Sequence, residues 1–207
     1  MSALPSQSRY IIGTEACERF SFYGMKSILM LYMTGHLLMS DNWSTSTLHI
    51  FVAMVYLLPL AGAWLADKVW GRYKTILYIS LLYCVGHGVL ATADLSHTIE
   101  ARRYILMAGL FIIALGAGGI KPCVSAFMGD QIPNKSPQLM TKAFNAFYWA
   151  INLGSFFSFL VIPAMEQRYG YSWAFAVPGL FMGVATFVFW LGRKNYHKTP
   201  PARNSGQ

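Results

Sequence analysis

The stretch Tyr104–Met128, YILMAGLFIIALGAGGIKPCVSAFM, decides the class of this protein. It is 25 residues long and contains one charged residue, Lys121. An α-helix rises about 1.5 Å per residue, so a run of this length can cross a hydrocarbon core of roughly 30 Å. We therefore interpret the stretch as a membrane-spanning helix.

Five further apolar runs of similar length lie on both sides of this stretch. They carry few charges, and Gly and Pro recur inside them, as is common in transmembrane helices. They lack the ten-residue apolar/polar alternation of an outer-membrane barrel. The predicted fold class is therefore all-α, a polytopic membrane protein with six transmembrane helices. The five runs are Tyr10–Leu38, Leu48–Ala66, Thr75–Ala93, Ala143–Met165 and Trp173–Leu191.

The composition supports this class and disfavours others. Only 12% of the 207 residues are charged and the mean hydropathy is +0.41, whereas soluble domains carry about 25% charged residues. Intrinsic disorder and a nucleic-acid partner are excluded, and a lipid bilayer is the expected surrounding. The residues form no nucleophile–base set, and the three cysteines show no metal-ligand spacing. We expect no enzyme activity, no metal and no cofactor.

The basic residues set the orientation, because most of the charges lie between the apolar runs. With the N-terminus inside, ten Lys and Arg residues fall in inner segments and three in outer loops. The positive-inside rule then predicts cytoplasmic N- and C-termini, in a bacterial inner membrane or a plasma membrane. The inner residues are Arg9, Lys68, Arg72, Lys74, Lys135, Lys142, Arg193, Lys194, Lys198 and Arg203, and the outer ones are Arg102, Arg103 and Arg168.

The composition changes after the last apolar run. Residues 1–192 are predicted to form a six-helix transmembrane bundle. Residues 193–207 are polar, contain Pro and show no periodicity, which is typical of a linker or a disordered end. We interpret them as a cytoplasmic tail.

The first predicted span contains four charged residues, Glu15, Glu18, Arg19 and Lys26. At about 100° per residue these side chains and Phe22 fall within an arc of roughly 100°. Facing lipid, the four charges would cost on the order of 10–14 kcal/mol. The face is therefore expected to point into a protein-lined or water-filled cavity. It is either an ion-pair cluster that joins helices or a proton or substrate site, and buried charge pairs add little net stability.

Lys121 is the second charge within an apolar run. It lies in the sequence GAGGIKP, residues 116–122, where glycines permit close helix approach. Lys121 is too far from either end of its span to reach water easily, so we expect it to pair with a carboxylate. Glu15 and Glu18 are the only acids inside the spans, which predicts a Lys–Glu pair across the first and fourth spans.

Polar residues in two other spans are further candidates. His49 precedes Tyr56 by seven residues, about two helical turns, so both are expected on one side of the second span. His49 is either an ordinary satisfied polar residue or a proton relay. Tyr148 and Asn152 lie four residues apart and share a face of the fifth span.

The short loop after the second span combines charges of both signs. Asp67 precedes Gly71, Arg72 and Lys74. The basic residues follow from the positive-inside rule, which does not account for Asp67. A carboxylate and basic groups at two helix ends can latch neighbouring helices together, and we predict such a latch here.

Four motifs resemble those of one family. Residues 15–24, EACERFSFYG, resemble the ExxERF(S/x)YYG signature of the proton-dependent oligopeptide transporters within the major facilitator superfamily. Residues 118–131, GGIKPCVSAFMGDQ, and 147–155, FYWAINLGS, are similar to two further signatures of that family. Residues 67–74, DKVWGRYK, resemble the loop motif of the superfamily. The three family motifs occur in order, each on the expected span.

The resemblance implies proton-driven symport of di- and tripeptides by alternating access. It assigns proton coupling and binding of the peptide carboxylate to the charged residues of the first and fourth spans. His49, in the stretch His49–Ala53, resembles a proton-coupling histidine of animal-type members. Phe22 departs from the motif, which usually has Tyr there, and this bears on substrate preference. The implied proton-coupling residues are Glu15, Glu18, Arg19, Lys121 and His49; the implied substrate-binding residues are Tyr23, Lys26, Tyr56, Lys121, Tyr148 and Asn152; the loop motif contributes Asp67, Gly71, Arg72 and Lys74.

Length is the larger departure from the family pattern. Members have two six-helix halves, and this chain resembles only the first, the N-terminal half, ending in what resembles the linker between them. The partner implied by the resemblance is a second six-helix half. The alternative is a truncated or half-size membrane subunit that transports nothing alone and pairs with a C-terminal bundle or with its own copy. Relatives that carry other anions, such as nitrate, keep the substrate class open.

Overall fold

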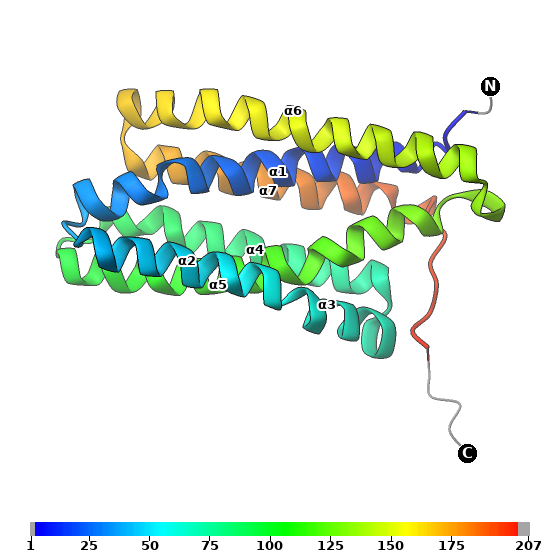
Figure 1. Ribbon diagram of the computed structural model, residues 1–207, viewed down its shortest axis with the longest axis horizontal. Coiled ribbons are helices and arrows are strands. Elements are labelled where there is room, and N and C mark those ends of the chain that lie inside the picture. The colour runs from blue at the N-terminus through cyan, green and yellow to red at the C-terminus, as the bar shows by residue number, and fades with distance from the viewer. Residues whose placement is uncertain (1–2, 203–207) are drawn as a thin grey trace, which may run out of the picture.

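The computed structural model describes residues 3–202, and all regular structure in that range is helical. The long helices run side by side, and the chain reverses direction at each end of the bundle (Figure 1). Short 3-10 and π-helical turns extend several of them. The helices are α1 (Ser8–Leu31), α2 (Asp41–Leu57), α3 (Pro59–Leu65), α4 (Arg72–Thr92), α5 (Ile99–Asp130), α6 (Pro137–Tyr169) and α7 (Tyr171–Leu191).

Within the described residues, five helical stretches are long and apolar enough to span a membrane: 41–70, 72–95, 99–130, 137–169 and 171–194. The first of these joins α2 and α3. The helix α1 is not among them because it carries five charged side chains, yet it packs lengthwise against α6 and α7 as a sixth rod of the bundle. The predicted fold class, an all-α bundle of a multi-pass membrane protein, is confirmed.

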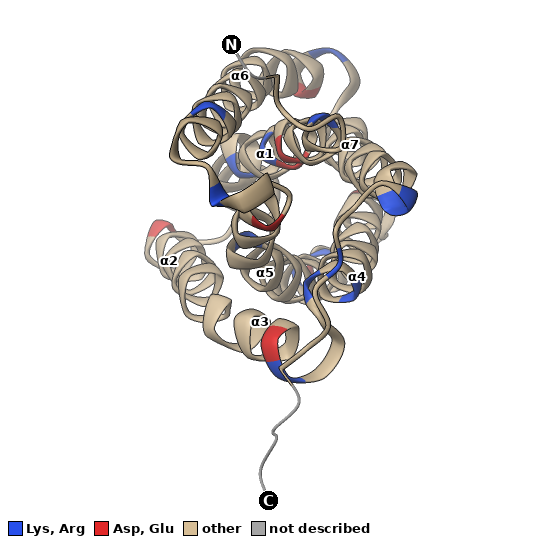
Figure 2. Cartoon of the chain, turned by 90° about the vertical axis from the view of Figure 1, so that its right-hand side faces the viewer, with Lys and Arg blue, Asp and Glu red and all other residues tan. Residues whose placement is uncertain are grey.

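Viewed from one end, four helices enclose the centre of the bundle (Figure 2). The helix α1 packs on α7, α7 on α4, and α4 on α5, while α6 lies outside α1 and the α2–α3 pair lies outside α5. Close backbone contact fixes α3 on α5, since a Cβ on Gly62 would lie 2.1 Å from the carbonyl oxygen of Gly119. The outer helices therefore expose broad apolar faces, as expected in lipid.

The second predicted span, Leu48–Ala66, was placed too late and is not one helix. It begins at Asp41, where the Ser40 hydroxyl accepts a hydrogen bond from the backbone N–H of Trp43 at 3.4 Å. It breaks between Leu57 and Pro59. Proline has no N–H to donate and its ring clashes with the preceding helical turn, which explains the break.

The predicted tail is not a disordered end over its described part, residues 193–202, which we call the strap. Tyr196 is only 7% exposed and its ring packs at 5.1 Å, edge to face, against that of Phe127. The Gln131 side chain donates to the His197 carbonyl at 3.0 Å and accepts from the His197 N–H at 2.9 Å. The burial of one aromatic residue, Tyr196, thus holds a segment of polar composition against the bundle. Arg203 and the rest of the predicted tail lie outside the described residues.

Replacing Tyr196 by Ala is expected to release the strap and to destabilise the bundle. Truncating a buried aromatic side chain costs about 3 kcal/mol or more. Thermal unfolding of the purified chain in lipid nanodiscs measures the loss. The matched control is Tyr169→Ala, at a position that is 63% exposed, which should change stability little. Equal stability of the two variants would show that the strap does not hold the bundle.

Candidate functional site

The charged residues predicted on the first span come together inside the bundle. The Arg19 Nε lies 3.1 Å from the Glu15 carboxylate and also forms an ion pair with Glu18. All three residues are buried, with Glu18 only 1% exposed. Two carboxylates and one guanidinium carry a net charge of −1. We call Glu15, Glu18 and Arg19 the acidic cluster.

Aromatic rings cover one side of the acidic cluster. The Arg19 guanidinium carbon lies 5.7 Å from the ring centroid of Phe22, a cation–π distance. The ring of Phe22 stacks on Phe51 of α2 with centroids 6.0 Å apart. Phe22 therefore has a packing partner across the helix interface, at the position where the sequence departs from its motif.

The predicted direct pair between Lys121 and a glutamate is wrong. Lys121 is exposed, and its ammonium lies 4.8 Å from the ring centroid of Tyr56 on α2. Lys121 is close enough to Glu15 for electrostatic attraction but is not within ion-pair distance. The reason is that Arg19, on the same helix as both glutamates, already forms an ion pair with each of them. The long lysine side chain is left to reach an aromatic ring.

The predicted substrate residues lie on exposed or half-buried surface rather than in the core. Tyr56 and Tyr148 are 67% and 66% exposed, and Asn152 is exposed as well. The Asn152 side chain donates to the Tyr148 carbonyl at 2.8 Å, which leaves the Asn152 carbonyl oxygen and the Tyr148 hydroxyl available. Only Lys121 and Tyr56 contact each other across helices. Tyr148 and Asn152 belong to α6, which packs on α1 and α7.

The remaining predicted residues flank this surface. Tyr23 and Lys26 are half-buried on α1, and the Tyr23 ring lies 6.0 Å from that of Phe159 on α6. His49 is exposed on α2, the same unbroken helix as Tyr56. We use the name polar face for the set of these exposed or half-buried side chains, which are Tyr23, Lys26, Tyr56, Lys121, Tyr148 and Asn152.

The predicted loop latch forms, with one partner that sequence reasoning missed. The Arg72 guanidinium donates to both carboxylate oxygens of Asp130 at 2.7 Å and lies 3.6 Å from Asp67. Gly71 adopts φ +79°, which a residue with a side chain rarely does. Lys74 is exposed. Asp130, at the end of α5, was quoted in a motif without a role.

Three buried polar side chains on α4 were also missed. Ser80, Tyr83 and His87 are at most 1% exposed and point to the interior. Their spacing of three and four residues puts them on one helix face, a pattern that was visible in the sequence. It was hidden because the surrounding residues are apolar and because tyrosine is also common at membrane interfaces.

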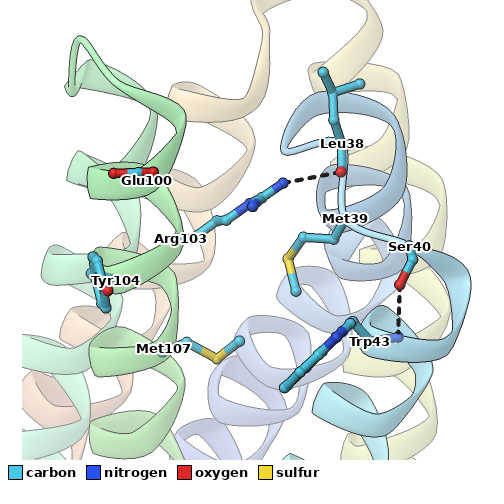
Figure 3. Close-up of a pocket in the computed structure, with 8 residues that line it drawn as sticks. All are labelled: Leu38, Met39, Ser40, Trp43, Glu100, Arg103, Tyr104 and Met107. Atoms are coloured by element: carbon cyan, nitrogen blue, oxygen red, sulfur yellow. Dashed lines mark hydrogen bonds between the residues drawn. The ribbon is translucent and has the colours of Figure 1, made fainter.

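A well-formed cavity lies elsewhere. It measures about 540 Å³ and opens between the start of α5 and the connection from α1 to α2 (Figure 3). Arg103 crosses it to donate to the Leu38 carbonyl at 3.0 Å, and Glu100 lies on the α5 side. None of the predicted site residues lines this cavity. The polar face is therefore an open surface and not an enclosed pocket of this chain.

Comparisons with known proteins agree on one family. Residues 73–207 match the model of the POT family, PTR2. The chain is 42% identical over 216 residues to solute carrier family 15 member 2 of Homo sapiens, and 42% identical over 209 residues to peptide transporter family 1 of Drosophila melanogaster. The two alignments cover 98% and 97% of this chain but only 29% and 28% of the lengths of those relatives. The chain thus spans less than a third of their length.

Solved structures give the same picture. The POT family transporter PepTSo matches with a TM-score of 0.89 and 46% identity, over 99% of this chain and 40% of that one. A peptide transporter POT variant in complex with alafosfalin matches with a TM-score of 0.83 and 32% identity, over 93% of this chain and 39% of that one. These relatives are named as transporters.

Gly154 tests how α6 is held beside the acidic cluster. A Cβ at Gly154 would lie 2.3 Å from the carbonyl oxygen of Ala16, which neighbours Glu15. We expect Gly154→Ala to separate α6 from α1 and to destabilise the chain by about 1–3 kcal/mol, as overpacking does. The control is Gly88→Ala, where no atom lies within 4 Å, and a gain of about 0.5–1 kcal/mol is expected there. Thermal unfolding of both variants is the measurement, and equal effects would contradict the packing.

Proposed function

The chain belongs to the POT family, and from that membership we propose that its helices form the N-terminal half of a proton-coupled symporter for di- and tripeptides. In this proposal the acidic cluster takes up the proton and the polar face binds the peptide. Protons are the coupling ion, and no other cofactor is involved.

The observation that carries the proposal is that two buried carboxylates, Glu15 and Glu18, share the single guanidinium of Arg19. With both carboxylates ionised, the cluster has one negative charge in excess. Charges within a membrane are costly and cluster where they have a function. A single proton on either glutamate makes the cluster neutral, so the cluster is suited to take up one proton at a time.

Proton uptake and peptide binding are linked through Lys121. While the cluster is charged, Glu15 attracts the Lys121 ammonium, which lies within electrostatic range. Once a proton neutralises the cluster, that attraction ends and Lys121 is free to bind the peptide carboxylate. The linkage is reciprocal, and such couplings are worth about 1–3 kcal/mol. Symport follows, because the proton favours the peptide and the peptide favours the proton.

Other predicted residues take roles around this pair. Exposed Tyr56 and Asn152 would orient the peptide by hydrogen bonds, with Tyr23, Lys26 and Tyr148 at the edges of the polar face. His49, exposed on α2, would bring the proton to the cluster. The latch of Asp67, Gly71, Arg72 and Asp130 would hold one end of the bundle closed in one conformation.

Alternating access requires a second body against which the bundle moves. We propose a second six-helix half, with uptake expected only when both halves are present. We further propose a cell membrane, inner or plasma, with both termini on the cytoplasmic side. The described chain begins and ends at the same end of the bundle, and Lys and Arg residues gather there (Figures 1 and 2), as the positive-inside rule requires.

Glu18→Gln tests the proton step. The chain, co-expressed with the C-terminal half of a family member, is assayed in vesicles for dipeptide uptake. We expect the variant to lose proton-driven accumulation, so that the peptide only equilibrates, and to keep counterflow exchange, because Gln cannot carry the proton but still fills the site.

Two controls accompany this measurement. Glu100→Gln removes an exposed carboxylate far from the cluster and should accumulate peptide normally. The chain expressed alone distinguishes a half that needs a different partner from one that pairs with its own copy. Undiminished accumulation by Glu18→Gln would overturn the proton assignment, and no uptake by any pairing would overturn the transport proposal.

A further inference from the structure

A second group of buried polar side chains lies behind the acidic cluster, between α1 and α4. Ser21 and His87 are fully buried, as is Tyr83. They belong to α1 and α4, two of the helices that enclose the centre of the bundle (Figure 2). The proton route proposed above uses none of them.

These residues form two contacts one helical turn apart. The Ser21 hydroxyl and the His87 Nε2 are 2.9 Å apart, in hydrogen-bond contact. One turn away on both helices, the Tyr83 hydroxyl lies beside the Glu18 carboxylate. The Tyr83 and His87 rings stack with centroids 5.1 Å apart. Glu18, Tyr83, Ser21 and His87 thus lie in one region between α1 and α4, with Glu18 and His87 about one helical turn apart.

This group of side chains is incompletely hydrogen-bonded. The Nδ1 of His87, the Tyr83 hydroxyl and the Ser80 hydroxyl have no hydrogen-bond partner in the protein. Leaving a buried polar group unpaired costs about 1–3 kcal/mol each, and bilayer lipid supplies no partner. Polar sites of this kind hold ordered water. A purely structural interface at this place would be satisfied by apolar side chains.

The surroundings of His87 offer a single acid. From α1 it meets Ser21, with Glu18 and its partner Arg19 one turn away. From α7, Gly179 approaches so closely that a Cβ there would lie 3.1 Å from the His87 Cβ, and from α5 the apolar Ile113 packs at neighbouring Gly86. Its neighbour on α4 is the phenol of Tyr83. Among the groups that the structure describes around it, Glu18 alone can balance a proton on His87.

We propose that His87 is a second proton site of the bundle, which exchanges one proton with Glu18 through the hydroxyls of Tyr83 and Ser21. The O–H bond of protonated Glu18 breaks, Ser21 gives its hydroxyl proton to Nε2 of His87, and Ser21 regains a proton from Glu18 by way of Tyr83 or a water. The products are the Glu18 carboxylate and a His87 imidazolium. No net charge is gained or lost.

The consequence for transport rests on the proposed function of the acidic cluster. Moving the proton to His87 restores the Glu18–Arg19 ion pair while the proton stays inside the bundle. The proton is then held away from the polar face, at a place that the peptide does not reach. His87 is therefore a reservoir, distinct from His49, which is exposed on α2.

The transport test is the pH profile of uptake by the chain paired with a second half. His87→Gln keeps a hydrogen bond to Ser21 but cannot carry a proton, and the control His97→Gln alters an exposed loop histidine. We expect His87→Gln to flatten the dependence of uptake on pH, with roughly a tenfold loss of the pH stimulation, and to leave counterflow exchange unchanged. A profile identical to that of His97→Gln would overturn the proposal.

A second test needs no transport. The full chain, with ¹⁵N-labelled histidine in nanodiscs, is titrated by NMR between about pH 3 and 8, which covers the range of exposed histidines and the lower range of buried ones. One titrating signal should vanish in His87→Gln, and its midpoint should move by about one pH unit in Glu18→Gln but not in Glu100→Gln. The proposal would be overturned by a His87 signal whose chemical shift does not change with pH, or whose midpoint is the same in Glu18→Gln as in the unmodified chain. If no pairing takes up peptide but the His87 midpoint still depends on Glu18, only the proposed transport function is overturned.

Discussion

The sharing of one guanidinium by two buried carboxylates is the constraint on which this bundle depends. Arg19 lies between Glu15 and Glu18 in the middle of α1, the rod with too many charges to face lipid. A single unpaired charge at that depth costs several kcal/mol, so α1 has to be enclosed by other helices. The packing of α6 and α7 along its length, the close approach at Gly154 and the ring of Phe22 all follow from this requirement.

Arg19 also explains why the polar face presents a cation while the carboxylates are buried. Because the guanidinium occupies both carboxylates, Lys121 lies free on the polar face, where it meets Tyr56. The bundle thus separates two buried carboxylates from a surface that presents a cation. A direct Lys121–glutamate pair would have merged the two and left Lys26 as the only cation of the polar face.

Most of the fold was predictable because membrane spanning imposes a length and a composition. The run from Tyr104 to Met128 is apolar for 25 residues, and a helix there was the only physical solution. Pro59 marked the break in the second rod but was overlooked, since proline is tolerated in many spans. Tyr196 was missed because the position of the strap depends on one buried ring. The composition of the whole segment, which is polar, does not show the effect of a single residue. The pairing of Arg19 with both glutamates depends on rotamers within one turn, which spacing alone does not determine.

The break at Pro59 gives the second rod two parts with different attachments. The part after it, α3, is bound backbone to backbone through Gly62 and Gly119. The part before it, α2, also packs on α5, and it buries Phe51 and Val55. Pro59 thus divides the second rod into two parts that are held on α5 in different ways, one through backbone contact and one through side chains. The contact between Lys121 and Tyr56 joins α5 to α2 three residues before Pro59, so it links the polar face to the point where the rod is interrupted.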